Sequence, residues 1–363
     1  MTDQTEIARV LGALADPYNG ASLDSLGAVE SLSVAGGKVQ VSLALGYPAA
    51  TDERLAEQVQ RALMALDGVD AVDLDLRWSV AAHPAANSAQ AVPGVKNIIA
   101  VASGKGGVGK STTAANLALA LAAQGARVGV LDADIYGPSQ PQMLGVGQRR
   151  PQIVGEGKAQ QMVPIEAHGL QTISMGYLVT EQTPMVWRGP MVSGALKQLL
   201  SQTRWDDVDY LIIDMPPGTG DIALTLSQSV PVTGAVIVTT PQDIALLDAV
   251  KGIEMFRKVN VPVLGVIENM ATHVCSNCGH EEAIFGAGGG ERIARDYDTS
   301  LLGALPLSLA VREQADSGVP SVVAEPDGDA AQAYRSIALK MAARLWQENT
   351  QAAPAPIFDA VDD

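Results

Sequence analysis

The chain is short of cysteine, of basic residues and of long apolar runs, and each shortage excludes a class of protein. Only two of its 363 residues are cysteine, so no disulfide framework can support the fold. Its 24 lysines and arginines face 40 aspartates and glutamates, and the net charge of −16 argues against sequence-independent binding to nucleic acid. No apolar run reaches the roughly 18 residues of a membrane span, so we expect no transmembrane helix.

Targeting signals are also lacking at both ends of the sequence. The start, MTDQTEIARV, has neither the basic segment nor the apolar core of a secretory signal. The end, QAAPAPIFDAVDD, is acidic and cannot form a basic amphipathic membrane anchor. These features predict a cytoplasmic protein with neither a membrane nor a nucleic acid as partner. The chain does contain 47% hydrophobic residues, which is enough for the cores of two domains.

A glycine-rich stretch at 104–111, GKGGVGKS, is the most informative part of the sequence. It matches the phosphate-binding loop G-x-x-x-x-G-K-[ST] and lies between a strand-like apolar run and an Ala/Leu-rich helical run. Glycines remove side chains that would keep backbone N–H groups from converging on phosphate oxygens. Lys110 can reach the β- and γ-phosphates, and the Ser111 hydroxyl can bind Mg²⁺. The predicted nucleotide-binding residues of the loop are Gly104, Lys105, Gly106, Gly107, Val108, Gly109, Lys110, Ser111 and Thr112.

From residue 97 onward, strand-like and helix-like patterns alternate, which predicts an α/β fold: a P-loop NTPase with a mostly parallel, doubly wound sheet. Asp132 and Asp134 follow the second expected strand, at the edge where such sheets bind ligands. Asp214 ends a buried strand in the Walker B pattern, where its carboxylate holds Mg²⁺ directly or through water. The expected strands are 98–102, 127–131, 210–213, 235–239, 263–267 and 301–305, and the expected helices are 111–123, 241–256 and 328–346.

Residues 145–190 are rich in Gly, Gln and Pro and show no clear alternation. We expect loops flanking an interface here, with one strand-like piece at 170–174 and a turn at 187–190. Arg188 in that turn is a candidate interface or sensor residue.

A second lysine, Lys105, directly follows the first glycine of the loop. In this respect the chain resembles the deviant phosphate-loop ATPases, which include cell-division, partition, nitrogenase-reductase and cluster-carrier proteins. The resemblance implies a homodimer with ATP between the subunits, in which Lys105 reaches the phosphates bound by the partner. Lys105, Lys110, Asp134 and Asp214 are therefore the expected catalytic residues.

The same resemblance implies a specific role for Asp134 and for four further positions. Asp134 would orient the attacking water, with Asp132 as the second candidate for that role. Gly218 lies in the turn after Asp214, where its N–H would sense the γ-phosphate. Asn269 would hydrogen-bond the adenine, and the loop at Pro306 would cover it.

Both cysteines of the chain, Cys275 and Cys278, form one C-x-x-C motif. Two thiolates at this spacing can ligate one metal centre, but they are only half of the set that a [4Fe–4S] cluster or a structural zinc needs. A two-fold dimer would supply the other half. Other interpretations stay open: zinc held with His273 and His280 or across the dimer, a redox dithiol, or inert thiols.

Residues 97 to about 345 resemble the Mrp/ApbC-like iron–sulfur cluster carrier ATPases. These proteins carry the same C-x-x-C followed by a stretch that reads here as Phe285, Gly286, Gly288, Gly289 and Gly290. The resemblance implies a labile [4Fe–4S] cluster bridged between two subunits, received from an upstream scaffold and delivered to apo iron–sulfur proteins, with slow ATP hydrolysis coupled to transfer. The alternative is a MinD/ParA-like positioning ATPase with structural zinc at the cysteines. A nitrogenase-reductase-like electron donor and a metabolic kinase are further rivals.

The strand-like and helix-like patterns of residues 1–80 predict a separate small α/β domain, with a hairpin turn at Gly36 and Gly37. It resembles the MIP18-like domain that precedes many cluster-carrier ATPases. The domain contains no cysteine, so we expect it to dock partners instead of binding metal. A linker at 81–96, an ATPase domain at 97–347 and a flexible acidic tail at 348–363 complete the expected organisation.

Overall fold

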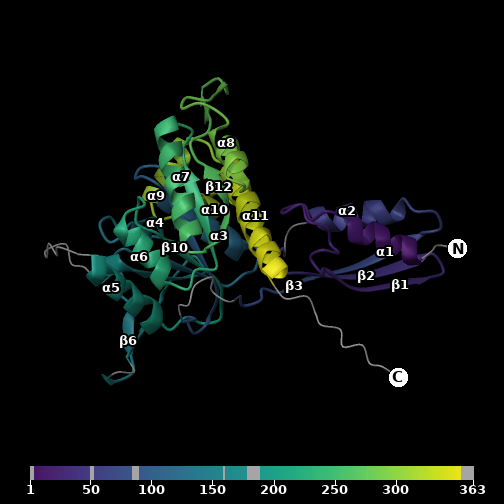
Figure 1. Ribbon diagram of the computed structural model, residues 1–363, viewed down its shortest axis with the longest axis horizontal. Coiled ribbons are helices and arrows are strands. Elements are labelled where there is room, and N and C mark those ends of the chain that lie inside the picture. The colour runs from purple at the N-terminus through teal and green to yellow at the C-terminus, as the bar shows by residue number, and fades with distance from the viewer. Residues whose placement is uncertain are drawn as a thin grey trace. The chain divides into compact units, whose positions relative to one another are not determined.

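The computed structural model describes residues 4–49, 53–83, 90–157, 160–177, 189–275 and 277–352 (Figure 1). The chain divides into two compact units. One comprises Met1–Ser79 with Ala342–Asp363, and the other comprises Val80–Met341. We describe each unit by itself.

The first unit is a three-stranded sheet with two helices. The strand order is β1-β2-β3, with β1 and β2 antiparallel and β2 and β3 parallel. The turn between β1 and β2 contains Gly36 and Gly37, both with positive φ, as the predicted hairpin requires. Leu55, Val59 and Leu63 recur at helical spacing and form the buried face of α2. The elements are α1 (Gln4–Ala13), β1 (Val29–Ala35), β2 (Lys38–Leu45), α2 (Arg54–Met64) and β3 (Ala71–Trp78).

The end of the last helix, α11 (Asp329–Ala352), belongs to this first unit. Trp346 packs on Tyr47, whose hydroxyl donates to the buried Asp16 carboxylate at 2.6 Å. Gly46 faces the same indole, which leaves no room for a Cβ. The helix therefore runs to Ala352, whereas the sequence predicts its end at residue 346 and a tail from residue 348. Residues 353–363 of that tail lie outside the described part of the chain.

The second unit contains an eight-stranded sheet in the order β15-β12-β11-β4-β10-β5-β9-β8. Its pairings are parallel except for the edge pair β8 and β9, which is antiparallel. This confirms the predicted fold class, a mostly parallel doubly wound sheet. The strands are β4 (Val95–Ala102), β5 (Val128–Asp132), β8 (Ile165–Ala167), β9 (Leu170–Ser174), β10 (Val208–Asp214), β11 (Gly234–Thr239), β12 (Val263–Glu268) and β15 (Leu301–Ala304).

Helices flank the sheet of the second unit (Figure 1). α3 packs on β4, β5 and β10, and its Ala and Leu side chains are buried along most of its length. α5, α6, α7 and α8 contact one another in succession. No helix in the described ranges is long and apolar enough to cross a membrane. The helices are α3 (Lys110–Ala123), α4 (Gln140–Met143), α5 (Gly189–Gln202), α6 (Asp221–Ser229), α7 (Asp243–Lys258), α8 (Gly289–Asp296), α9 (Leu309–Asp316) and α10 (Ser321–Ala324), with a 3₁₀ turn, η2, at Met175–Tyr177.

The strand predicted at 170–174 is confirmed as β9, but some of the loops predicted elsewhere over 145–190 are short strands. Besides β8 and β9, the structure forms an antiparallel hairpin of β6 (Gln152–Val154) and β7 (Gln161–Val163). Strands of three residues are too short to show the alternation by which strands are recognised in a sequence. Trp187 and Arg188 of the predicted turn at 187–190 lie outside the described residues, whereas Gly189 and Pro190 begin α5 and do not form a turn.

Candidate functional site

The phosphate loop lies at the carboxyl edge of the sheet, between the central strand β4 and helix α3. β4 has β11 and β10 as neighbours, and β5 lies beyond β10. The register places Asp214 of β10 opposite both Val101 of β4 and Asp132 of β5. Parallel strands end at one edge of a sheet, so the fold brings the loop and the two acidic strand ends together.

Glycine is required at two positions of the loop for different reasons. Gly109 has φ +79°, and a Cβ on it would overlap the Asn269 amide nitrogen. Gly104 has an ordinary φ, but a Cβ there would overlap the backbone of Asp248 in α7. The loop is therefore enclosed by β12 on one side and α7 on the other.

A pocket of about 210 Å³ opens over the loop. Among the predicted loop residues, Gly104 and Val108 do not line it, and the Val108 side chain is buried. Asp134 does line it, together with Pro217 from the turn after Asp214. A site of this size, walled by glycine backbone and two lysines, suits a phosphate chain. The lining residues are Ser103, Lys105, Gly106, Gly107, Gly109, Lys110, Ser111, Thr112, Asp134, Ser139, Met143 and Pro217.

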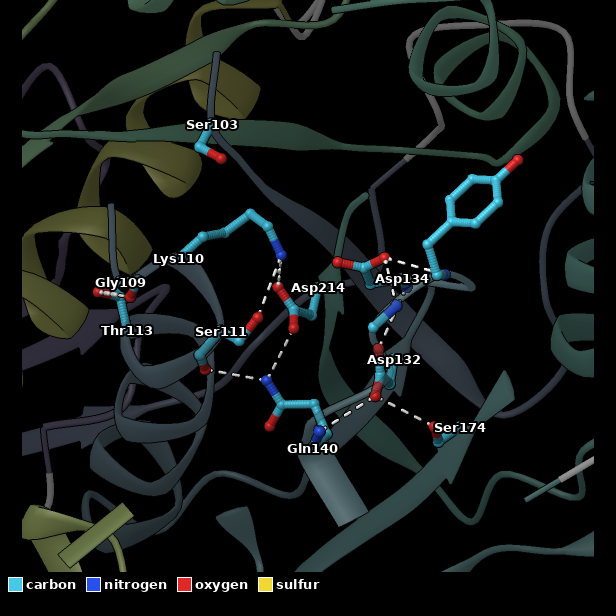
Figure 2. A network of polar contacts seen from close by, with 12 residues as sticks. Ser103, Gly109, Lys110, Ser111, Thr113, Asp132, Asp134, Gln140, Ser174 and Asp214 are labelled. Carbon is cyan, nitrogen blue, oxygen red and sulfur yellow. Dashed lines mark hydrogen bonds and ion pairs between the residues drawn. The ribbon is translucent and has the colours of Figure 1, made fainter. Parts of the chain in front are cut away.

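Lys110 and Asp214 form a buried ion pair beneath the pocket (Figure 2). Lys110 is 6% exposed and Asp214 is fully buried. The Lys110 ammonium also lies 3.3 Å from the Ser111 hydroxyl. The other Asp214 oxygen accepts a hydrogen bond from the Gln140 amide at 3.0 Å. The loop lysine and the Walker B carboxylate, 104 positions apart in sequence, thus make one contact.

Asp132 and Asp134 differ in what they face. Asp132 is fully buried and accepts hydrogen bonds from the Gln140 N–H, the Ser174 hydroxyl and the Asp134 N–H. Burial, with the charge of Asp214 as the second cause, raises the pKa of Asp132 to about 7. Asp134 lines the pocket instead, and its Oδ1 accepts the N–H groups of the next turn at 3.2 and 3.3 Å. The structure therefore places Asp134, and not Asp132, at the nucleotide pocket.

The oxygen donors in the pocket and directly beneath it fit Mg²⁺, which prefers hard oxygen ligands. Ser111 and Asp214, the two predicted ligands, both contact the Lys110 ammonium, so their oxygens already converge on one cation. Serine hydroxyl and carboxylate are the donors that hold this ion in P-loop NTPases.

Gly218 donates its N–H to the Ser103 carbonyl at 2.9 Å. The predicted role of this N–H, contact with a γ-phosphate, is therefore not what the structure presents. The sequence could not reveal this bond, because Ser103 precedes the loop and Gly218 follows a different strand. The contact instead ties the turn after Asp214 to the start of the phosphate loop.

Asn269 and Pro306 lie at the ends of neighbouring strands, β12 and β15. The buried Asn269 amide donates to the Val108 carbonyl at 2.8 Å, so this side chain fixes the phosphate loop. Neither residue lines the pocket over the loop. Their predicted contact with adenine stays a prediction.

The two cysteines lie in a small hairpin between β12 and α8. Its strands are β13 (His273–Val274) and β14 (Glu281–Glu282), which pair antiparallel. The Cys275 N–H donates to the His280 carbonyl, and the Gly279 N–H donates to the Cys275 carbonyl, each at 2.9 Å. Gly279 has φ +70°, which closes this tight turn. Cys278 is exposed and Cys275 is half-buried.

The turn around Cys275 favours the thiolate form of its side chain. Hydrogen bonds from the backbone N–H groups of Asn277 and Cys278, and from the Cys278 thiol, lower its pKa. The thiolate is the form that binds metal. Within the described residues, no three His, Cys, Asp or Glu side chains converge on a metal site, so His273 and His280 do not complete one here.

Sequence reasoning missed two polar residues next to the pocket, Ser139 and Gln140. Besides its bond to Asp214, the Gln140 amide donates to the Ser111 carbonyl at 2.9 Å, so it joins β10 to α3. Its own oxygen and the Ser139 hydroxyl are buried and find no partner among the described residues. No motif marks either residue, because their contacts come from distant parts of the chain.

A larger hollow of about 500 Å³ lies at the opposite edge of the sheet. Gln90, Pro93, Lys197 and Pro231 are among its lining residues. Pro93 lies just before the start of β4, and Pro231 lies just before the start of β11. None of the predicted site residues lines it.

Comparison with known proteins gives matches over both units. Residues 94–342 match the family described as NUBPL iron-transfer P-loop NTPase, and residues 4–74 match the family described as iron-sulfur cluster assembly protein. An iron-sulfur cluster carrier protein from Pseudomonas fragi is 60% identical over 282 residues, which cover 77% of this chain and 97% of the relative. One from Haemophilus influenzae is 50% identical over 346 residues, which cover 95% and 93%.

A solved structure is similar to part of this chain. It is a nucleotide-binding protein from Archaeoglobus fulgidus in complex with ADP, with cobalt found in it. Its sequence is 36% identical, and the match covers 65% of this chain and 90% of that chain with a TM-score of 0.56.

Proposed function

This chain belongs to the NUBPL iron-transfer P-loop NTPases, a family of iron–sulfur cluster carriers, and we propose that it hydrolyses ATP and carries a [4Fe–4S] cluster between two copies of itself. Both family resemblances expected from the sequence are confirmed. The single observation that carries the proposal is the pairing, in one unit, of a phosphate loop with an exposed two-cysteine turn.

The pocket over the phosphate loop is the proposed ATP site, with the adenine at Asn269 and Pro306. The Archaeoglobus relative is in complex with ADP, which supports a nucleotide here. Lys110 lies between Asp214 and the pocket, so an arriving phosphate gives its ammonium a second anion. Lys110 then shares its charge with the β- and γ-phosphates, and Asp214 and Ser111 would hold Mg²⁺. When bound, that ion supplies positive charge to the phosphate oxygens.

Hydrolysis requires a water placed in line with the γ-phosphate. Asp134 is the proposed residue, because it lines the pocket and, within the described part of the chain, the N–H groups of its turn engage only its Oδ1. Lys105 lines the same pocket and is half-buried. We assign it to the phosphates bound by the partner copy, where its charge stabilises the transition state.

The cluster is the cargo of this protein, and Cys275 and Cys278 are its proposed ligands. A [4Fe–4S] cluster takes four thiolates, and this chain has two. A two-fold axis beside the turn brings the same pair from a second copy, which completes the set. Apo iron–sulfur proteins would receive the cluster, and an upstream scaffold would supply it. The unit that matches the cluster assembly family, the predicted 1–80 domain, is the proposed docking module, joined by the 81–96 linker to the 97–347 ATPase domain.

Anaerobic reconstitution with iron and sulfide tests the proposal. We expect about four irons and four sulfides per dimer in the wild type, because that is the composition of one bridged cluster. The Cys275→Ser/Cys278→Ser variant should hold none and should still bind ATP. Metal and sulfide analysis gives the cluster content, and light scattering on the same sample gives the number of chains per particle.

Two outcomes would overturn the carrier proposal. Stoichiometric zinc that iron does not displace would make the cysteine turn a structural clasp. A full cluster on a monomer would exclude the shared site. Ser at both positions keeps the side-chain size, so loss of iron with an unchanged melting temperature reports on the ligands and not on folding.

A further inference from the structure

Glu268, at the end of β12, is a buried carboxylate that none of the proposed steps uses. Its Oε2 accepts the N–H of Gly290 in the first turn of α8. A Cβ on Gly290 would lie 3.1 Å from the Glu268 Cβ and 2.8 Å from Leu301 Cδ1, and one on Gly289 would lie 3.2 Å from Glu268 Oε2. The glycine run after the cysteines therefore lets α8 begin directly on this carboxylate, where the positive end of a helix favours it.

The bond to Gly290 closes the exit of the cysteine hairpin, and a second set of bonds closes its entrance. The Ala271 N–H donates to the Leu305 carbonyl at 2.9 Å, and the Leu307 N–H donates to the Thr272 carbonyl at 2.7 Å. The segment from Ala271 to Gly290 is thus a loop with both ends fixed. We call these contacts the base of the hairpin.

The base of the hairpin is also in contact with the segments that we assign to nucleotide binding, the phosphate loop and the loop at Pro306. Pro306, the predicted adenine-covering residue, lies between the two residues that bond the entrance. Asn269, next to Glu268, donates to the Val108 carbonyl of the phosphate loop at 2.8 Å. Met270 follows with φ +57°, a left-handed conformation that a side chain adopts only when its surroundings enforce it. Glu268, Asn269 and Ala271 therefore bond α8, the phosphate loop and the 305–307 stretch, respectively.

We propose that Glu268 is a positioning residue through which adenine-nucleotide binding changes the geometry of the Cys275–Cys278 hairpin. The inference rests on the proposed nucleotide site and names how that site regulates the cysteines. A nucleotide that contacts Asn269 and the 305–307 stretch moves the entrance of the hairpin. The carboxylate holds the exit, so the turn carrying both thiols has to respond. The path begins at the adenine end, so ADP and ATP both act through it.

The two thiols themselves report on the hairpin, because the chain has no other cysteine. Cluster-free, reduced full-length protein is labelled with iodoacetamide, alone and with saturating Mg-ADP or Mg-ATP. In the wild type we expect either nucleotide to slow labelling about fivefold, at the lower end of ordinary coupling between two sites. Glu268→Gln keeps an acceptor for the Gly290 N–H but loses the charge, and it should reduce the effect to less than about twofold. Its ADP affinity, measured by calorimetry, should stay near the wild-type value.

Glu291→Gln is the matched control, since Glu291 is an exposed carboxylate in the same helix turn, and it should respond to nucleotide as the wild type does. Gly290→Ala tests the bond from its other side and should also uncouple the thiols, because its Cβ displaces the helix start. If Glu268→Gln lowers the affinity for ADP, the nucleotide effect on thiol labelling in Gly290→Ala is the measurement that tests the inference. A wild type without a nucleotide effect, or a variant with the full effect, overturns the inference. The assay needs no cluster, so failure of cluster loading would count against the carrier proposal alone.

Discussion

Asp214 and Cys278, two of the predicted site residues, differ in burial: the first is fully buried, whereas the second is exposed. Around Asp214, the ammonium of Lys110 and the amide of Gln140 occupy both carboxylate oxygens. Around the cysteines, the hydrogen bonds seen among the described residues come from the same tight turn, including the Cys278 thiol, and from its partner strand. The nucleotide site is thus anchored in the sheet. The cysteine site is a short loop that is fixed by the contacts at the base of its hairpin.

This difference matches the two proposed tasks. Stabilising charge on a transferring phosphoryl group requires groups that are already in place, since rearranging them would cost free energy at the transition state. A carrier has to release its cargo, so its ligands have to be reachable by an acceptor. Exposure of Cys278 meets that need, and in the proposed dimer the second pair of thiolates, from the partner copy, would be withdrawn without unfolding either chain.

The largest expected effect comes from disabling the nucleotide site while leaving the cysteine turn intact. Lys110→Ala removes the ammonium from both Asp214 and the phosphates. We expect ATP hydrolysis to fall on the order of 10²–10³-fold, the usual loss when one charge-stabilising donor is removed. Iron and sulfide loading should stay at the wild-type level, because no cysteine contact involves this residue. Steady-state ATPase assays and iron analysis on the same preparation measure both.

Lys251→Ala is the matched control for that change, since Lys251 pairs with Asp248 at an exposed position of α7. Its ATPase rate should equal that of the wild type, because surface ion pairs contribute little. If Lys110→Ala also loses the cluster, the two regions are not separable as described here.

A second prediction concerns the buried carboxyl group of Asp132, next to the nucleotide site. Burial, followed by the Asp214 charge, raises the pKa of Asp132 from 3.8 to about 7. Between these values the folded protein keeps a proton that the unfolded chain releases, so this residue lowers stability as pH rises from about 4 to about 7. Asp132→Asn cannot ionise, and its stability relative to the wild type should therefore increase by a few kcal/mol from pH 5 to pH 8, on the order expected from linkage. Thermal unfolding at both pH values measures the difference.

The diagnostic is the change with pH, since losing an acceptor for Ser174 or Gln140 costs the Asn variant a similar amount at either value. Asp316→Asn, at an exposed ion pair with Arg312, should show no such change. An equal stability difference at pH 5 and pH 8 would contradict the raised pKa.

Local patterns were enough to predict the central strands, the phosphate loop and the cysteine turn. Each is written in a few consecutive residues: an apolar run before GKGGVGKS, an apolar run ending in Asp214, and C-x-x-C. The doubly wound sheet then follows from alternation of strands and helices, and the strand order confirms it.

The contacts that join these elements could not be predicted from local sequence patterns. Gln140 joins Asp214 to the Ser111 backbone, and the Gly218 N–H bonds Ser103, across long separations in sequence. Short edge strands such as β8 carry too few residues for a period to show. The end of α11 was expected to be a tail because its residues are polar, although Trp346 anchors it on Tyr47.

The same backbone feature occurs in both regions and has different surroundings in each. Gly109 of the phosphate loop and Gly279 of the cysteine turn have φ +79° and φ +70°. A Cβ at Gly109 would overlap the Asn269 amide, whereas one at Gly279 would have no atom within 4 Å. A substitution in the cysteine turn therefore meets only the cost of the left-handed backbone.

The smallest predicted effect follows from that contrast. Gly279→Ala should weaken cluster retention about fivefold, since a left-handed backbone costs an alanine about 1 kcal/mol. ATP hydrolysis should not change. Gly279→Asn is the control, because asparagine adopts this conformation more readily, and it should restore most of the retention. The rate of iron loss to a chelator, measured anaerobically, distinguishes the three proteins. Equal rates in all of them would mean that the cluster holds the turn, and the exposed region would then be organised by its cargo and not by its backbone.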